Sequence, residues 1–158
     1  MGGVAGHAGL FSAVDDLAIF AQMVLDGGSR KGVQILSPLM VEKMTTPQSP
    51  HDRIPLMGLG WNIDSPLVSV GSFGQRDFTG TGIWIDPVSP TYVIILINRV
   101  HPNGKGNAEP LRTKVLSLVS EVIGITSRTL LSNYCEQGNN NSGKMQTGIA
   151  VSCLAKAS

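Results

Sequence analysis

An apolar run of six residues sets the strongest limit on how this chain can fold. Residues 92–97 read Tyr-Val-Ile-Ile-Leu-Ile, so both faces of an extended segment would be apolar and mostly β-branched. Such a segment fits a central strand that is covered on both faces of a sheet. It is far shorter than the roughly 20 apolar residues that cross a bilayer. The run therefore predicts a buried strand and no membrane span.

Two further segments have the composition of strands. Residues 78–85 are rich in β-branched and aromatic residues, and residues 59–63 form a shorter candidate. The sequence Asp-Pro-Val-Ser-Pro at 86–90 separates 78–85 from the apolar run. This spacing predicts an antiparallel hairpin with a loop of about five residues.

Three segments have helical periodicity, and turn residues mark their ends. Ser12 and Asp15 have the spacing of a capping box, which predicts the start of the first helix. Ser37 precedes a proline and is the expected N-cap of the second helix. The three helices are expected at about 12–27, 37–44 and 110–124.

These elements predict a fold of the α/β (α+β) class, with an antiparallel sheet flanked by helices. The chain has 158 residues, which fits one domain at most or part of a larger one. It is 42% hydrophobic and 15% charged, which excludes a disordered chain. A net charge of +1 without a basic run argues against a nucleic-acid partner.

The chain divides into a structured body and a polar C-terminal region. We expect the body at 1–125, a polar linker at 126–143 and a tail at 144–158 that is too short to form a domain. Cys135 and Cys153 lie in this region and are interpreted as incidental thiols, because a disulfide scaffold needs far more cysteine. Whether Met1 is the native start stays open.

A search for catalytic and metal-binding motifs finds mostly absences. His-Glu-x-x-His and Cys-x-x-Cys do not occur and the three histidines are scattered, so no metal and no cofactor are expected. No serine has a lysine three residues later, so no serine has an evident local base. His7 as a general base stays an alternative, although a histidine without a visible partner is more often structural.

The most specific motifs of the chain are Gly-Ser-Phe-Gly at 71–74, Phe-Thr-Gly-Thr at 78–81, Trp-Ile-Asp-Pro at 84–87 and Asn-Arg-Val-His-Pro at 98–102. These motifs resemble the β-lactamase-related serine hydrolases, which include class C β-lactamases, penicillin-binding proteins of the D-alanyl-D-alanine carboxypeptidase kind and related esterases. The resemblance covers about residues 1–125 and corresponds to the C-terminal half of the family's catalytic domain. It therefore implies a partial β-lactamase/transpeptidase-like fold.

The resemblance also implies a substrate-binding segment. The third motif of the family, Lys-Thr-Gly or His-Thr-Gly, falls in register on Gln75, Arg76 and Asp77. Gln75 can hydrogen-bond but cannot titrate, and Arg76 can pair with a substrate carboxylate. The amide of Phe78 would donate to a developing oxyanion, which the charge of Asp77 would oppose. A polar stretch that protects a strand edge is the alternative interpretation of these residues.

The family's Ser-x-x-Lys nucleophile lies upstream of the matched segment, so we assign no catalytic residue within this chain. The resemblance implies that the partner is the missing N-terminal half and that the substrate is a β-lactam, a D-alanyl peptide of peptidoglycan type or an ester. It also implies a periplasmic or secreted parent protein, although no signal peptide is visible here. A non-catalytic binding or assembly module and a nonfunctional truncated frame are the alternatives. Residues 144–149 weakly resemble the opening strand of a peptidoglycan N-acetylmuramidase-type domain.

Overall fold

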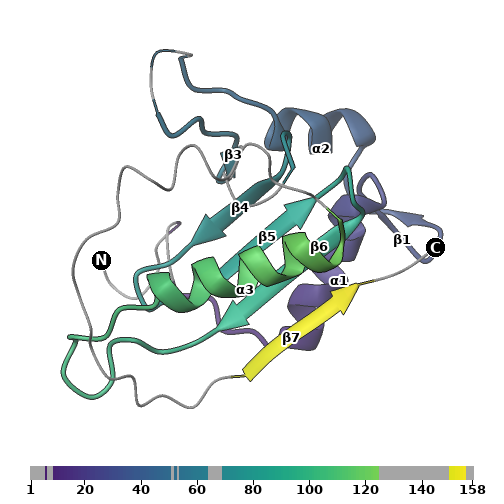
Figure 1. Ribbon diagram of the computed structural model, residues 1–158. Helices are drawn as coiled ribbons and strands as arrows, with labels where there is room; N and C mark the ends of the chain where they lie inside the picture. The colour runs from purple at the N-terminus through teal and green to yellow at the C-terminus, as the bar shows by residue number, and fades with distance from the viewer. Residues whose placement is uncertain are drawn as a thin grey trace.

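The computed structural model describes residues 6, 9–50, 52, 54–63 and 69–124, and the backbone of 150–155. An antiparallel sheet lies between α1 (Val14–Leu25) and α3 (Glu109–Val122), which cover its opposite faces (Figure 1). The strands, in spatial order, are β3 (Asn62–Ile63), β4 (Phe73–Arg76), β5 (Gly82–Asp86), β6 (Thr91–Leu96) and β7 (Ala150–Ala155). The predicted sheet flanked by helices is confirmed.

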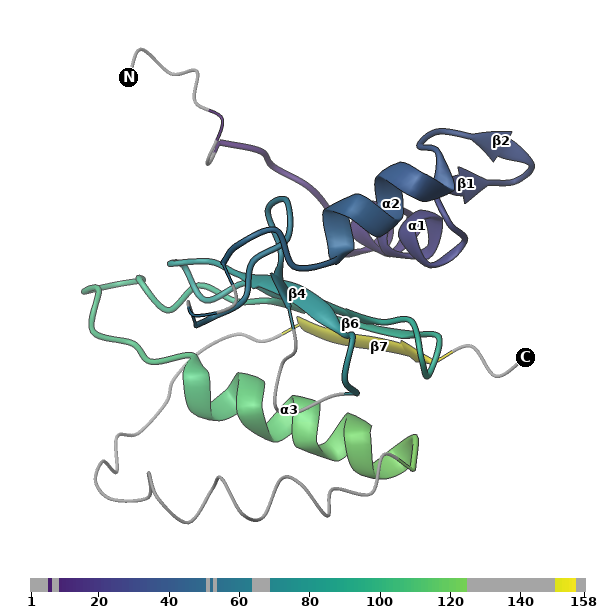
Figure 2. The ribbon, with the colours of Figure 1, turned by 90° about the horizontal axis from the view of Figure 1, so that it is seen from above.

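A smaller group of elements lies on the α1 side of the sheet. It consists of α2 (Pro38–Thr45) and a two-stranded sheet of β1 (Ser29–Arg30) and β2 (Val33–Gln34). Figure 2 shows α1, α2, β1 and β2 on one side of the large sheet and α3 alone on the other. No helix in the described part of the chain is long and apolar enough to cross a membrane.

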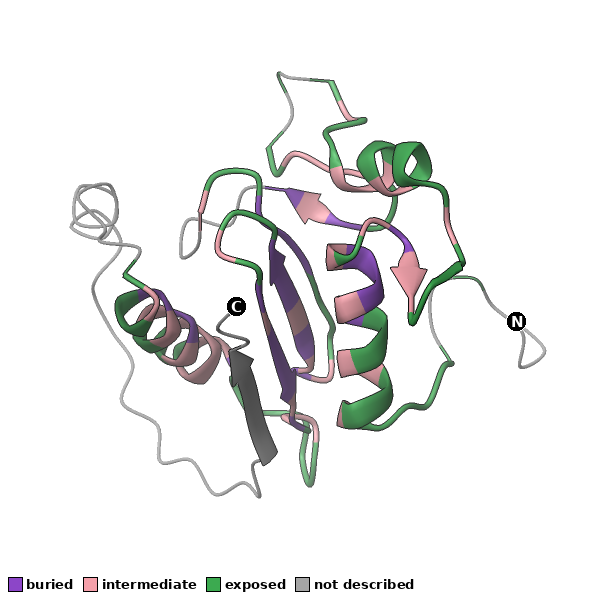
Figure 3. Cartoon of the chain, turned by 90° about the vertical axis from the view of Figure 1, so that its right-hand side faces the viewer, coloured by how far each residue is buried: buried purple, intermediate pink, exposed green. Residues whose placement is uncertain are grey.

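The apolar run forms β6, and both faces of this strand are buried. Val93 and Ile95 are 2% and 0% exposed and pack on the α3 side with Trp84. Ile85 of the neighbouring strand packs on the opposite side, with residues of α1. Strand residues alternate between faces, so an almost continuous apolar sequence fills two cores at once. Figure 3 shows the buried strands between partly exposed helices.

Trp61 packs between α1 and the face of the sheet opposite α3. Its ring stacks on Phe20 of α1 at 6.2 Å and meets the edge of Phe73 of β4 at 5.2 Å between centroids. Trp61 is 6% exposed and Trp84 is 5% exposed. Both tryptophans therefore serve the core, as the burial preference of indole rings predicts.

The predicted hairpin is confirmed, and one carboxylate organises its loop. β5 and β6 pair in antiparallel register from Asp86 opposite Thr91 to Gly82 opposite Ile95. The Asp86 carboxylate accepts hydrogen bonds from the amides of Val88 and Ser89 and from the Ser89 hydroxyl. This local bonding satisfies the buried Asp86 and closes the turn.

The predicted strand at 78–85 is too long. β5 begins only at Gly82, because residues 77–80 form a turn between β4 and β5. In this turn the Gly80 amide donates to the Asp77 carbonyl, and the Asp77 amide donates to the Thr81 carbonyl. The residues with strand composition at 78 and 79 therefore belong to the turn.

The two predicted helix caps have different outcomes. The Ser37 hydroxyl accepts from the Met40 amide at 3.2 Å, which confirms Ser37 as the N-cap of α2. The capping box at Ser12 is wrong, because Ala13 holds the N-cap position of α1 with an extended backbone. The Ser12 hydroxyl instead donates to the Ala13 carbonyl. A one-residue shift of the helix start removes the geometry that a capping box needs.

β7 is a strand that the sequence does not predict. Its backbone pairs in antiparallel register with the whole of β6, from Thr91 opposite Ala155 to Leu96 opposite Ala150. Cys153 lies within this strand. The predicted linker at 126–143, which includes Cys135, and the segment 144–149 lie outside the described residues, so the domain division stays a prediction.

Candidate functional site

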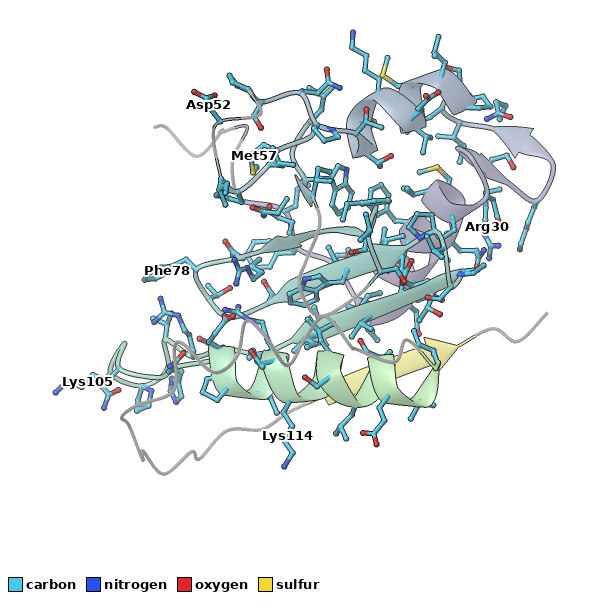
Figure 4. The ribbon with its side chains drawn as sticks, turned by 45° about the horizontal axis from the view of Figure 1, so that its top comes forward. Arg30, Asp52, Met57, Phe78, Lys105 and Lys114 are labelled. Atoms are coloured by element: carbon cyan, nitrogen blue, oxygen red, sulfur yellow. The ribbon has the colours of Figure 1, made fainter. Side chains whose placement is uncertain are left out.

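The residues predicted to border a substrate lie together at one end of the sheet. Gln75 and Arg76 are the last two residues of β4, and Asp77 and Phe78 begin the turn that follows. All four are exposed, and Phe78 projects from this end of the molecule (Figure 4). Their side chains and backbone are nevertheless bonded to other groups of the protein.

Gln75 and Arg76 extend to different sides of the sheet. Adjacent residues of a strand alternate, so Gln75 lies on the side of Phe73 and Arg76 on the side of α3. The side-chain NH₂ group of Asn62, on β3, donates to the side-chain oxygen of Gln75 at 2.9 Å. Gln75 therefore keeps its NH₂ group available as a donor to a ligand.

Arg76 is paired with a glutamate at the start of α3. Its Nη1 lies 3.0 Å from Oε1 of Glu109, and Nη2 of Arg112 contacts the other oxygen, Oε2. Arg76 and Glu109 are half exposed, whereas the Arg112 side chain is only 11% exposed. Glu109 thus bridges two guanidinium groups from different elements of the fold.

The charges around Glu109 outweigh its partial burial. Burial alone would raise the pKa of this carboxyl group, because it disfavours the ionised form. The hydrogen bond and charge of Arg112, followed by the charge and hydrogen bond of Arg76, lower the pKa below its ordinary value. Glu109 is therefore ionised at neutral pH and neutralises part of this cationic cluster.

Asp77 turns its carboxylate back onto its own turn. Oδ2 accepts the Thr79 hydroxyl at 2.8 Å. The backbone N–H groups of Phe78 and Thr79 also favour the charged form of this carboxylate. The hydrogen bond from the Thr79 hydroxyl lowers the pKa of Asp77 most. The backbone N–H groups of Phe78 and Thr79 lower it further, despite the opposing effect of burial. The Phe78 amide, which the resemblance assigns to an oxyanion, thus already lies beside the anion of its own turn.

Two arginines donate hydrogen bonds to the backbone carbonyl groups of the same turn. Nε of Arg99 donates to the Phe78 carbonyl and Nη1 of Arg112 donates to the Gly80 carbonyl, while the Arg99 amide donates to the Thr79 carbonyl at 2.8 Å. The Arg99 guanidinium also lies over the Phe78 ring at 4.2 Å. All three carbonyl groups of residues 78–80 are therefore bonded to Arg99 or Arg112.

Gly80 lets this turn pack closely against the start of α3. Its φ of +108° is a conformation that residues with a side chain rarely adopt. A Cβ at this position would also lie 3.0 Å from the Cβ of Ala108 and from Cγ1 of Ile97. The glycine is required for the short connection between the turn and Arg112.

The residues that partner the predicted site were not predicted from the sequence; they are Asn62, Thr79, Arg99, Glu109 and Arg112. One signal for them was present, because Glu109 and Arg112 have the i, i+3 spacing of a helical ion pair. His7 and His51 lie outside the described residues, so the structure does not place His7 near a substrate. No group of three metal-ligating side chains occurs among the residues that the structure describes.

Comparison with known proteins gives two consistent matches. Residues 1–116 match the Beta-lactamase family. Proteins named "Putative D-alanyl-D-alanine carboxypeptidase" from Salmonella paratyphi B, Salmonella newport and Salmonella heidelberg are each 38% identical over 110 residues. The matched region covers 64% of this chain and 25% of each relative. The chain thus spans about a quarter of the length of these relatives.

Proposed function

This chain belongs to the beta-lactamase family, and we propose that it forms the C-terminal part of the catalytic domain of a serine hydrolase that acts on D-alanyl peptides. The Salmonella relatives carry the name of such a peptidase, which supports this substrate class over a β-lactam or an ester. The nucleophilic serine would come from polypeptide upstream of the matched segment.

The turn at residues 77–80 is the observation that carries this proposal. Arg99 and Arg112 bond its carbonyl groups, and the amides of Phe78 and Thr79 lie beside the exposed Asp77 carboxylate at the end of the sheet. Fixed amides aimed at one anion can stabilise the charge that develops on an acyl carbonyl oxygen. The turn has this geometry before any substrate arrives, which is how such donors are most effective.

The side chains around the turn would bind and orient the substrate. The Arg76 guanidinium can form two parallel hydrogen bonds to the terminal carboxylate of a peptide. Gln75 can donate its NH₂ group to a substrate carbonyl but cannot accept or release a proton at neutral pH. Proton transfer would therefore depend on groups of the upstream part, and Asp77 would slow the reaction by competing for the amides.

A chimeric enzyme tests the proposal. The matched quarter of a Salmonella relative is replaced by residues 1–124 of this chain, and acylation by fluorescent penicillin and D-alanine release are measured. We expect both reactions, at rates below those of the unchanged relative because Asp77 blocks the amide donors. The substitutions Gln75→His, Arg76→Thr and Asp77→Gly restore the family motif in the chimera. A chimera that folds cooperatively but is never acylated, even with these three substitutions, would contradict the proposal.

A non-catalytic binding module is the second candidate, because all three positions of the third motif are changed and their side chains bond within the protein. The same chimera distinguishes the two. A binding module would bind the D-alanyl peptide without forming an acyl-enzyme. The hydrolase would form one.

A further inference from the structure

We propose that Arg76 and Arg112 form a carboxylate-binding pair that Glu109 occupies from within the chain. Glu109 would then compete with an incoming carboxylate and act as an internal latch on the substrate site. The choice of a peptide carboxylate as the ligand rests on the proposed function. The latch itself rests on the contacts of Glu109.

The geometry is that of a bound carboxylate. Each oxygen of Glu109 meets a different guanidinium group, Oε1 with Arg76 and Oε2 with Arg112. Arg76 is on β4 and Arg112 is on α3, so two elements of the fold converge on one anion. Guanidinium groups arranged in this way would give the same charge-assisted hydrogen bonds to the carboxylate of a ligand.

Arg76 and Arg112, the two sides of this carboxylate-binding pair, differ in how firmly they are fixed. Arg112 is 11% exposed and also donates to the Gly80 carbonyl, which fixes its position. Arg76 is 51% exposed and can turn toward solvent. Pairing between exposed charges of this kind changes an equilibrium by no more than about fivefold. Arg76 is therefore the arm that can exchange Glu109 for a ligand at small cost.

The surrounding charges favour an anion once the latch opens. Arg99 adds a third guanidinium beside the turn, where it lies over the exposed Phe78 ring. Without Glu109, the three guanidinium groups around the turn would be accompanied by only the carboxylate of Asp77, which is bonded to its own turn. An external carboxylate would restore the balance that Glu109 now provides.

The test uses the whole chain with Glu109→Gln, which keeps the size of the side chain and removes its charge. Glu121→Gln is the matched control, because it makes the same charge change at an exposed position of the same helix. The probes are acetate, N-acetyl-D-alanyl-D-alanine and the C-terminal amide of that peptide, titrated with NMR detection of the arginine Nε–Hε signals.

We expect Glu109→Gln to bind acetate and the peptide about two- to fivefold more tightly than the unchanged chain or Glu121→Gln. The peptide amide should bind equally weakly to all three proteins. Adding Arg76→Gln to Glu109→Gln should abolish the gain. In the unchanged chain, acetate should shift the Arg76 signal more than the Arg112 signal, which tests the latch without any substitution.

Three results would overturn the latch: equal affinity of Glu109→Gln and the unchanged chain, an equal gain in Glu121→Gln, or a gain that survives Arg76→Gln. Tighter acetate binding without tighter peptide binding would support the latch and count against a peptide substrate. Failure of the latch and failure of the proposed function are thus separate outcomes.

Discussion

Trp61→Ala should lower the free energy of unfolding by about 3–5 kcal/mol, as expected when a buried tryptophan is truncated. Trp61 is 6% exposed and contacts Phe20 of α1 and Phe73 of β4. Its removal leaves a cavity between the helix and the sheet and removes both of these aromatic contacts. Folded domains have a total stability of about 5–15 kcal/mol, so this loss is a large fraction of the total.

Urea unfolding followed by circular dichroism measures this effect. Trp61→Phe should cost less, because a ring remains between Phe20 and Phe73. Leu39→Ala is the control, because Leu39 is 73% exposed on α2 and its truncation should change stability by no more than about 0.5 kcal/mol. A loss of less than 1 kcal/mol for Trp61→Ala would show that α1 does not pack on the sheet as described.

Asp77→Gly should raise the kcat of the chimeric hydrolase by about 10²–10³-fold, the effect of restoring one oxyanion donor. The Asp77 carboxylate is stabilised by the backbone N–H groups of Phe78 and Thr79, so a substrate oxyanion must compete for them with an anion that is covalently part of the turn. Removing the side chain frees both amides and leaves Arg99 and Arg112 to hold the carbonyl groups.

Asp77→Asn separates charge from hydrogen bonding in the same assay. Its side-chain oxygen can still accept the amides, but the repulsion of a developing negative charge is gone, so kcat should lie between the two other values. An unchanged kcat in Asp77→Gly, with an unchanged melting temperature, would show that the amides of this turn do not contact the reacting oxygen.

The sequence predicts the centre of the fold well, because local patterns determine it. The apolar run at 92–97 can be satisfied only where both faces of a strand are covered, and the Asp-Pro-Val-Ser-Pro loop forces the chain back into a hairpin. Ser37 is recognised as an N-cap because its bond to Met40 spans three residues. The motifs at 71–102 predict the family, and the match of residues 1–116 to the Beta-lactamase family confirms it.

The candidate site is predicted only in part, because its bonds join distant segments. Arg76 is 33 residues from Glu109, and Arg112 is 32 residues from Gly80, so no local pattern shows that they meet. The predicted roles of Gln75, Arg76, Asp77 and Phe78 treat them as free to meet a substrate. In the structure each of them has a partner within the protein, so a substrate would have to displace or share these contacts.

The most direct test of the central claim is the intact mass of the isolated chain after incubation with a fluorophosphonate or a fluorescent penicillin. We predict no covalent adduct on the isolated chain and a single adduct on the chimera, located outside residues 1–124. An adduct on a serine of the isolated chain that disappears when this serine is replaced by alanine would contradict the claim that the nucleophile comes from elsewhere.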